Sequence, residues 1–410
     1  MRARHAALCL LALLVLQAAP AAAQCGGICL YEVGSADLGR AAAGAGALAS
    51  DASTALWNPA GLTELEGSQV MLGLVGVFPE LNPELSGRTI SPDPAPNGGG
   101  DAADFAPLVG GYISAELPWG LHFGLASTAL FGGGTDYDGD WTGRSFVTDN
   151  SLTAFLIQPS LAYAFTDWLS LGAGPAILYT SFEQRLKITA LPGEPTAKIA
   201  NADDWSAGAA VSALLKPREG TRIGVSYRSE IQADTSGRLE GPSGLNPVID
   251  TDFTFPQGVN LSLFQQVTDT WALLADVGWS DWSRFGNIPL QIGAIAGTQR
   301  RRWDDTWRVG AGFQYAASET LTLQGGFSYD SSPVQASRLL PDIPASEQYR
   351  FAAGLLLRPK PYVELSMGYQ FLWFGDMEID QVALPGGVIL DGEYDPAHAH
   401  QLGTSLTVKF

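Results

Sequence analysis

The sequence is poor in charged residues and in the residue types that form catalytic or metal sites. Charged residues make up 16% of the chain and hydrophobic residues 46%, with only four histidines and three cysteines. Neither a Gly-x-Ser-x-Gly elbow nor a His-Glu-x-x-His motif is present. Acidic residues outnumber basic ones by 42 to 23, and a nucleic-acid-binding surface needs the opposite balance. We therefore predict no catalytic residues, no metal, no cofactor and no nucleic-acid partner.

Long apolar runs are also missing. The N-terminus has Arg2 and Arg4, an apolar core over Ala6–Leu16 and small residues at Ala21–Ala23, which is typical of a cleavable secretory signal. That core is too short to span a bilayer as a helix, and no later run reaches the necessary length of about 18 residues. We predict a signal peptide over residues 1–23 and no spanning helix.

Two cysteines remain after export, in the sequence Cys25-Gly-Gly-Ile-Cys29. In an oxidising compartment they can pair, and the glycines permit a short loop. We predict a Cys25–Cys29 disulfide, with two free thiols as the alternative. The loop is too small for a large entropic gain, and the segment offers too few ligands for a metal.

From about residue 104, apolar and polar residues alternate in segments near ten residues long. The segment 307–315 has Trp307, Val309, Ala311, Phe313 and Tyr315 on one face, and Arg308, Gly310, Gly312 and Gln314 on the other. A soluble antiparallel sandwich can show the same alternation. Aromatic residues at the ends of the apolar faces favour a lipid-facing band instead.

Fourteen such segments can be counted, joined alternately by tight turns and long polar loops. They lie near 69–78, 104–117, 121–132, 152–166, 169–188, 203–216, 221–239, 252–267, 270–282, 304–315, 320–330, 349–358, 361–374 and 398–410. Backbone groups in lipid must be paired, which requires a closed barrel when no helix spans. We predict an all-β, fourteen-stranded antiparallel barrel over residues 69–410, in the bacterial outer membrane and monomeric.

The two ends of the exported chain have separate predicted roles. Residues 24–68 are rich in Ala and Gly and do not alternate, so we predict a plug, because fourteen strands leave a lumen to fill. A disordered periplasmic tail is the alternative. The last segment alternates and ends on Phe410, which predicts an assembly signal for the barrel assembly machinery.

Several motifs are similar to those of one transporter family. The plug contains Gly39, Arg40, Gly44, Gly46 and Asp51, followed by Asn58-Pro59-Ala60. Further matches are Tyr227–Glu230, Trp282–Phe285, and Asp330–Val334 followed by Arg338, Pro341 and Arg350. In these motifs the chain resembles the FadL family of outer-membrane transporters for long-chain fatty acids and other hydrophobic molecules.

The resemblance implies that residues 24–68 form a hatch in the lumen. Pro59 fixes φ and Asn58 before it is biased to extended geometry, so this turn can hold a plug in one shape. Glycines allow close approach to the barrel wall. Arg40 in a lumen would need a carboxylate or carbonyl partner, for which Asp276, Glu230 and Glu364 are the candidates.

The resemblance also implies basic residues for a substrate carboxylate, near the outer end of the fifth strand and in the loop before the tenth. The residues there are Arg185 and Lys187, and the run Arg300, Arg301 and Arg302. Because the match is loose, neutral hydrocarbons stay open as substrates. Phosphates of surface lipopolysaccharide are an alternative ligand for the run.

The implied mechanism is capture among the extracellular loops, entry into an apolar pocket, hatch movement, and sideways exit at an inward kink of the third strand, residues 121–132. No proline marks that kink. Alternatives are a water-filled porin, an outer-membrane hydrolase, and a purely structural or adhesive barrel.

Overall fold

The computed structural model describes residue 30 and residues 36–92, 96–242, 244, 246–285, 287–292 and 295–410. The predicted signal peptide, Cys25 and Cys29 lie outside the described residues. Within the described part of the chain, no helix is long and apolar enough to cross a membrane.

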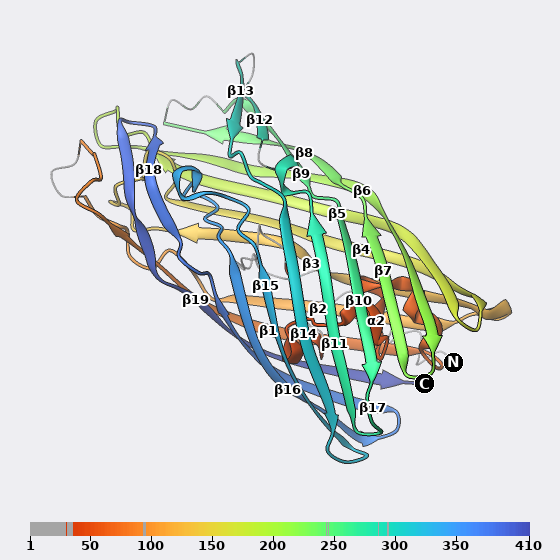
Figure 1. The fold of residues 1–410 in the computed structure, drawn as a ribbon. Helices are drawn as coiled ribbons and strands as arrows, with labels where there is room; N and C mark the ends of the chain where they lie inside the picture. Colours follow the sequence, from red (N-terminus) through yellow and green to blue (C-terminus); the bar gives the residue numbers. More distant parts are fainter. Residues whose placement is uncertain are drawn as a thin grey trace.

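The chain forms one antiparallel sheet that closes on itself, because β1 pairs with both β2 and β19 (Figure 1). The strand bounds are β1 Gln69–Leu85, β2 Ala106–Glu116, β3 Leu121–Asp136, β4 Asp149–Thr166, β5 Leu169–Lys187, β6 Thr196–Arg218, β7 Thr221–Arg228, β8 Ile231–Glu240, β9 Val248–Phe255, β10 Gly258–Gln266, β11 Trp271–Ser280, β12 Asn287–Ile292, β13 Ile295–Arg300, β14 Thr306–Ala316, β15 Leu321–Asp330, β16 Gln348–Lys360, β17 Val363–Trp373, β18 Glu378–Leu384 and β19 Val388–Lys409.

These nineteen segments of the described chain confirm the prediction of fourteen barrel strands. Strands β7 and β8 form one interrupted barrel strand, and β9 and β10 form another. The segments β12, β13 and β18 belong to hairpins beyond one end of the barrel (Figure 1). The C-terminus and the short turns lie at the other end, which is the periplasmic arrangement of such barrels.

Several strands run further outward than the alternation predicted. β1 continues to Leu85 rather than residue 78, and β19 begins at Val388 rather than residue 398. The two extensions pair with each other, with Leu85 opposite Gly392. These extensions lie beyond the lipid, so polar residues take the place of the apolar ones. The hydrophobic alternation therefore ends before the hydrogen-bonded strand does.

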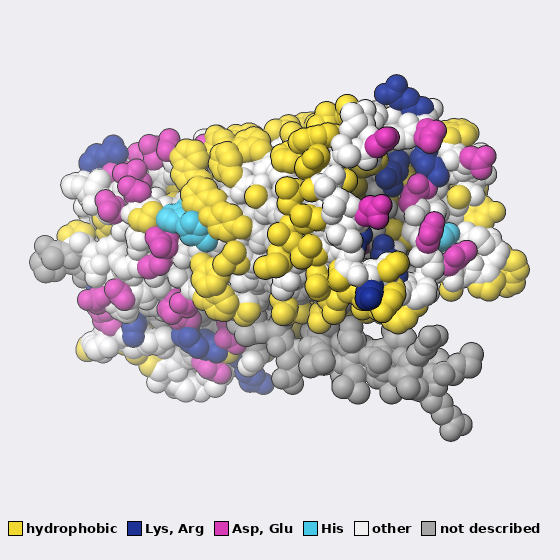
Figure 2. Space-filling model, turned by 90° about the horizontal axis from the view of Figure 1, so that it is seen from below, with side chains coloured by type: hydrophobic (Ala, Val, Ile, Leu, Met, Phe, Trp, Pro, Cys, Tyr) yellow, Lys and Arg dark blue, Asp and Glu magenta, His cyan; other side chains and the backbone are white. Residues whose placement is uncertain are grey.

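An apolar belt surrounds the barrel. Figure 2 shows hydrophobic side chains gathered across the middle of the molecule and acidic side chains toward its ends. The exposed aromatic residues include Trp119, Phe165, Trp168, Trp271 and Phe410 near the short turns, and Phe78, Trp205, Tyr227, Trp307 and Trp373 toward the long loops. Two such girdles are what a lipid-facing wall requires.

The N-terminal segment 36–64 lies inside the barrel as four short helices: η1 Ala36–Arg40, α2 Ala45–Leu48, α3 Thr54–Trp57 and η2 Pro59–Glu64. Figure 1 shows these coils within the wall, toward the end of the barrel that holds the C-terminus. They contact strands all around it, including β4, β5, β7, β10, β15, β16 and β17. We call residues 36–64 the plug.

Deletion of Phe410 is expected to lower the fraction of chain that reaches the outer membrane as a folded, heat-modifiable barrel. Phe410 ends the apolar face of β19, and its backbone N–H donates to Ser68 O at 2.8 Å, beside the first strand. The measurement is the ratio of folded to unfolded bands in unheated outer-membrane samples. Unchanged assembly would mean that this residue is not part of the assembly signal.

Candidate functional site

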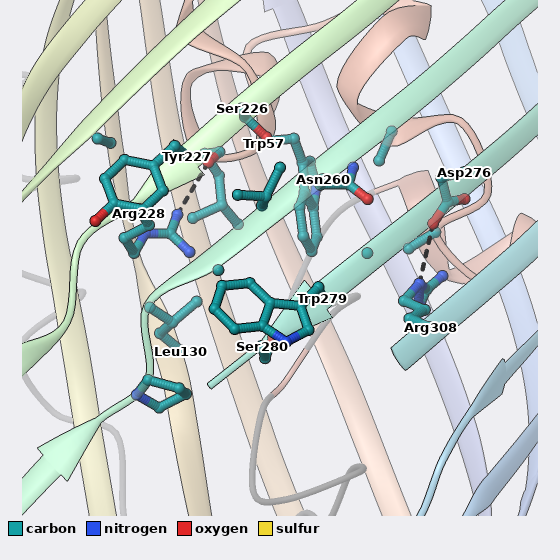
Figure 3. Close-up of a pocket in the computed structure, with 18 of the residues that line it drawn as sticks. Trp57, Leu130, Ser226, Tyr227, Arg228, Asn260, Asp276, Trp279, Ser280 and Arg308 are labelled. Carbon is teal, nitrogen blue, oxygen red and sulfur yellow. Dashed lines mark hydrogen bonds and ion pairs between the residues drawn. The ribbon is translucent and has the colours of Figure 1, made fainter. Parts of the chain in front are cut away.

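A cavity of about 130 Å³ lies between the plug and the barrel wall (Figure 3). Its lining is mostly apolar or aromatic, with a few polar groups. Lining residues from the plug include Ala42, Ala45, Leu56, Trp57 and Pro59; those from the wall include Leu130, Phe131, Arg228, Asn260, Asp276, Trp279 and Arg308. An apolar concavity with a few convergent polar groups is the usual form of a small-molecule site.

One side of the cavity is fixed by an ion pair that also holds the plug. Asp276 on β11 accepts from Arg308 Nε on β14 at 3.1 Å and from the backbone N–H of Gly44 at 3.0 Å. Gly44 has φ +69°, and a Cβ there would lie 2.7 Å from Leu274. The glycine therefore allows the plug backbone to reach the carboxylate.

The predicted Asn58-Pro59-Ala60 turn fastens the plug to the wall. The Asn58 Nδ2 donates to Gly46 O at 2.6 Å and to Ala213 O of β6 at 3.1 Å, while its Oδ1 accepts from Ala60 N–H at 3.1 Å. Pro59 begins η2 at the position where a missing N–H costs nothing. The turn is buried, so its hydrogen bonds hold the plug in one shape.

Arg40 has a local partner, and the three wall carboxylates proposed for it are engaged elsewhere. Its guanidinium pairs with Asp37 and also donates to Ala43 O at 3.2 Å and Gln324 Oε1 at 3.3 Å. Asp276 pairs with Arg308, Glu364 pairs with Arg358 at 2.6 Å, and Glu230 pairs with Arg284 at 3.4 Å. Arg40 thus has the expected carboxylate and carbonyl partners, but the three named candidates were wrong. Asp37 and Arg40 are three positions apart within η1, which puts the two side chains together.

The other predicted plug residues also have packing or capping roles. A Cβ on Gly39 would lie 2.8 Å from Gly354 Cα, and one on Gly46 would lie 2.7 Å from Ser262 Oγ. Asp51 accepts from Ser53 N–H at 2.9 Å, at the start of α3. Sequence reasoning placed these residues in the plug, and the structure shows what each one touches.

The basic residues predicted for a carboxylate do not line the cavity. Arg185 donates to Asp149 Oδ1 at 2.8 Å and Lys187 to Thr196 at 3.0 Å, both at the outer end of β5. The run splits: Arg300 and Arg302 are exposed, whereas Arg301 is 2% exposed.

Arg301 is buried because it ties down the loop between β15 and β16. Its Nη1 donates to Asp342 Oδ1 at 2.9 Å. The neighbouring Pro341 O accepts from the Tyr137 hydroxyl at 2.8 Å. Burial and the nearby Tyr394 raise the pKa of Tyr137, so its hydroxyl remains a donor at neutral pH. These contacts hold the loop between β15 and β16 against the outer parts of the chain around Tyr137 and Arg301.

Arg228 is the cation that sequence reasoning missed. It lies on β7, lines the cavity, and donates from Nη2 to two neutral oxygens, Leu56 O at 3.1 Å and Gln158 Oε1 at 3.2 Å (Figure 3). The motif Tyr227–Glu230 was noticed as a family feature. The alternation of the strand places Arg228 on the inward face, and this could have identified it as a site residue.

Strand β3 has an irregularity at Leu130, which we call the kink. The β3–β4 register shifts between Ala129 and Phe131, which marks a bulge, and the β2–β3 ladder ends at the pair Gly110–Thr128. Phe131 then reaches inward to the rings of Phe255 and Trp282, at 4.8 and 5.9 Å between ring centres. The kink is a bulge, which needs no proline. The signal in the sequence was three successive glycines, Gly132–Gly134.

The N-terminal segment contacts this kink. The backbone N–H of Leu30 donates to Leu130 O at 2.8 Å, and both residues line the cavity. Leu30, the kink and the cavity therefore meet at one place.

Comparison with known proteins gives a consistent result. Residues 16–410 match the family model described as outer membrane protein transport protein (OMPP1/FadL/TodX). Outer membrane protein P1 of Haemophilus influenzae is 27% identical, over 84% of this chain and 85% of that protein. The long-chain fatty acid transport protein of Salmonella typhi is 24% identical, over 87% and 89%.

Two solved structures share the fold. A FadL homologue from Pseudomonas aeruginosa superposes with a TM-score of 0.85 at 21% identity, covering 94% of this chain and all of that one. The toluene transporter TodX of P. putida gives 0.66 at 16% identity, over 88% and 94%. The chain belongs to the OMPP1/FadL/TodX family of outer-membrane transport proteins.

Proposed function

We propose that this barrel imports long-chain fatty acids or similar hydrophobic molecules, with the plug acting as a movable hatch. The observation that carries the proposal is the apolar cavity held between the plug and the kink at Leu130. Relatives described as long-chain fatty acid transport proteins support the fatty acid as substrate.

The cavity volume supports hatch movement. At about 130 Å³ it is close to the engineered cavity of ~150 Å³ that admits benzene. A ring or a short piece of alkyl chain fits without rearrangement, whereas a long chain must displace part of the lining. Leu56 and Trp57 of the plug are that part. Each buried methylene adds ~0.8 kcal/mol, so a long chain supplies the free energy for the displacement.

The exit supported by this arrangement is sideways, beside β3. The β2–β3 ladder is incomplete beyond Thr128, and Leu30 covers Leu130 from inside. Withdrawal of the N-terminal segment would connect the cavity with that gap. An apolar solute leaving into lipid avoids the cost of entering water.

A neutral hydrocarbon is the second candidate substrate, favoured by the small cavity. Organic-solvent extraction of the purified protein followed by mass spectrometry tests both. Co-purified fatty acids or hydrocarbons would support the proposal, and an empty extract together with high steady conductance would indicate a porin.

Arg228→Gln is expected to weaken binding of palmitate and leave binding of hexadecane nearly unchanged. A guanidinium in the cavity wall can hold a carboxylate by charge-assisted hydrogen bonds, worth ~1.5–3 kcal/mol or roughly 10- to 100-fold in affinity. Hexadecane binds through methylene burial alone. The measurement is the dissociation constant of each ligand by displacement of a fluorescent probe.

A variant with Arg300→Ala and Arg302→Ala is the comparison, because both residues are exposed and lie outside the cavity lining. Selective loss of palmitate binding in this variant alone would assign the carboxylate site to the outer loop. Equal loss of both ligands in Arg228→Gln would mean that Arg228 only supports Leu56. If the variant with Arg300→Ala and Arg302→Ala binds both ligands as tightly as the parent, the ligand of these arginines is lipopolysaccharide.

A further inference from the structure

A second interruption of the wall lies far along the chain from the kink, where β7 gives way to β8 and β9 to β10. The β7–β10 ladder ends at the pair Arg228–Gly258, and pairing resumes between β8 and β9 at Ile231–Phe255. Two residues on each strand intervene, Ser229–Glu230 and Pro256–Gln257. Pro256 has no N–H to give to a ladder. Both neighbouring strands therefore lose regular pairing at the same level.

The cavity is lined here by residues from both faces of the wall. Val211, Tyr227, Val259 and Trp279 are cross-strand partners in one outward-facing row over β6, β7, β10 and β11, and all four line the cavity. Ser226 and Asn260 line it from the inward face. Alternate residues of an intact strand point their side chains to opposite sides, so four outward-facing residues in the lining of a lumenal cavity are unexpected. They lie beside the interruption, which is where the cavity approaches the outer surface of the wall.

Three of the four inward side chains at this level are small. The inward row next to the interruption is Ala210, Arg228, Gly258 and Ser280, paired in register across the strands. The Arg228 guanidinium donates to Leu56 O of the plug and to Gln158 Oε1 of β4. On the outside, a polar strap crosses the interruption. The Tyr227 hydroxyl donates to Gln257 Oε1 at 3.0 Å, and Gln257 Nε2 donates to Asp281 Oδ2 at 3.1 Å.

The interruption lies at the outer aromatic girdle. Trp279 pairs in register with Trp307, which is more than half exposed, and Tyr227 belongs to the same level. Aromatic girdles mark the boundary between the hydrocarbon core and the head groups. The outward row therefore meets the acyl chains of the outer leaflet.

We propose that this interruption is a lateral window, through which an alkyl chain exchanges between the cavity and the outer leaflet of the bilayer. It is separate from the gap beside β3 and can operate while Leu30 covers Leu130. Its occupant is an unbranched apolar chain, because the mouth is formed by Val211, Val259 and two aromatic rings. The Tyr227–Gln257–Asp281 strap narrows the mouth.

The test uses the full-length protein in vesicles that contain a phospholipid with a photoreactive diazirine on its acyl chain. After illumination, mass spectrometry locates the adducts. We expect adducts on the inward-facing Asn260, as well as on the outward-facing Leu261. Ser262, which faces inward one level further from the window and is buried, should carry none.

Two variants on the lipid face separate this route from others. Val259→Trp should remove the Asn260 adduct, because the indole would cover the mouth, and Leu261→Trp should leave it in place. Val259 and Leu261 are 41% and 50% exposed, so both positions accept a large apolar side chain. Absence of Asn260 adducts in the unmodified protein, or adducts that survive Val259→Trp, would overturn the proposal. Because labelling needs no transport, the result is independent of the import function.

Discussion

Replacement of Gly326 by leucine is expected to turn a plugged barrel into a conducting pore. Gly326 lies on β15 with its Cα directed at the plug, and a Cβ there would lie 2.1 Å from Arg40 O and 2.5 Å from its carbonyl carbon. The obstacle is backbone, which cannot rotate away, so either the plug or the strand must move. The strand is held by ladders on both sides, with β14 and β16, whereas the plug is held by individual hydrogen bonds such as Gly44 N–H to Asp276 and Asn58 to Ala213 O. The plug should therefore leave its place.

Single-channel recording in planar bilayers measures the effect. The parent protein should pass little steady current, and the Gly326→Leu variant should pass a steady one. Gly325→Leu is the matched control, since a Cβ at Gly325 would meet the ring edge of Phe313 at 2.8 Å and Ala352 O at an ordinary 3.6 Å, on the other face of the same strand. A folded Gly326→Leu barrel that conducts no more than its parent would show that the plug tolerates displacement without opening a path.

Strand positions within the membrane were predictable because lipid imposes one rule on every strand. Outward residues such as Val309 and Phe313 must be apolar, and the pairing of β14 with both neighbours follows from closure. The rule ends where the lipid ends. The outer halves of β1 and β19 are held by hydrogen bonds but lack an apolar face. The break between β7 and β8 does not interrupt the alternation of apolar and polar residues. Neither feature can therefore be recognised from the hydrophobic pattern.

The site was predictable only in part. The plug motif could be located because it departs from alternation, and its Asn58-Pro59 turn follows from the preferences of those two residues. The cavity could not be located, because its lining comes from Leu30, the plug and six strands, which only the closed barrel brings together. Arg228 and Arg301 look alike in sequence, yet one lines the cavity and the other pairs with Asp342. Position relative to the wall, rather than residue type, decides which cation can meet a substrate.

Asn58→Asp is expected to lower uptake of a hydrophobic substrate by at least 10-fold in cells that assemble the barrel normally. Aspartate has the size of asparagine and can still accept from Ala60 N–H. It cannot donate to Gly46 O and Ala213 O, and its charge would face both carbonyl oxygens. Each buried acceptor left without its donor costs ~1–3 kcal/mol, and 1.4 kcal/mol already corresponds to about tenfold in an equilibrium.

The substitution destabilises the plug rather than the barrel, because the strand ladders do not depend on Asn58. Leu56, Trp57 and Pro59 form part of the cavity wall, so a displaced turn removes the surface that binds the substrate. Uptake of radiolabelled palmitate is the measurement, with heat modifiability as the check on assembly. Thr63→Ala is the control: it removes hydrogen bonds to Ala60 O and Ser170 from the same helix, η2, outside the cavity lining. Normal uptake by a correctly assembled Asn58→Asp variant would count against a hatch, since the fastening at Asn58 would then be irrelevant to transport.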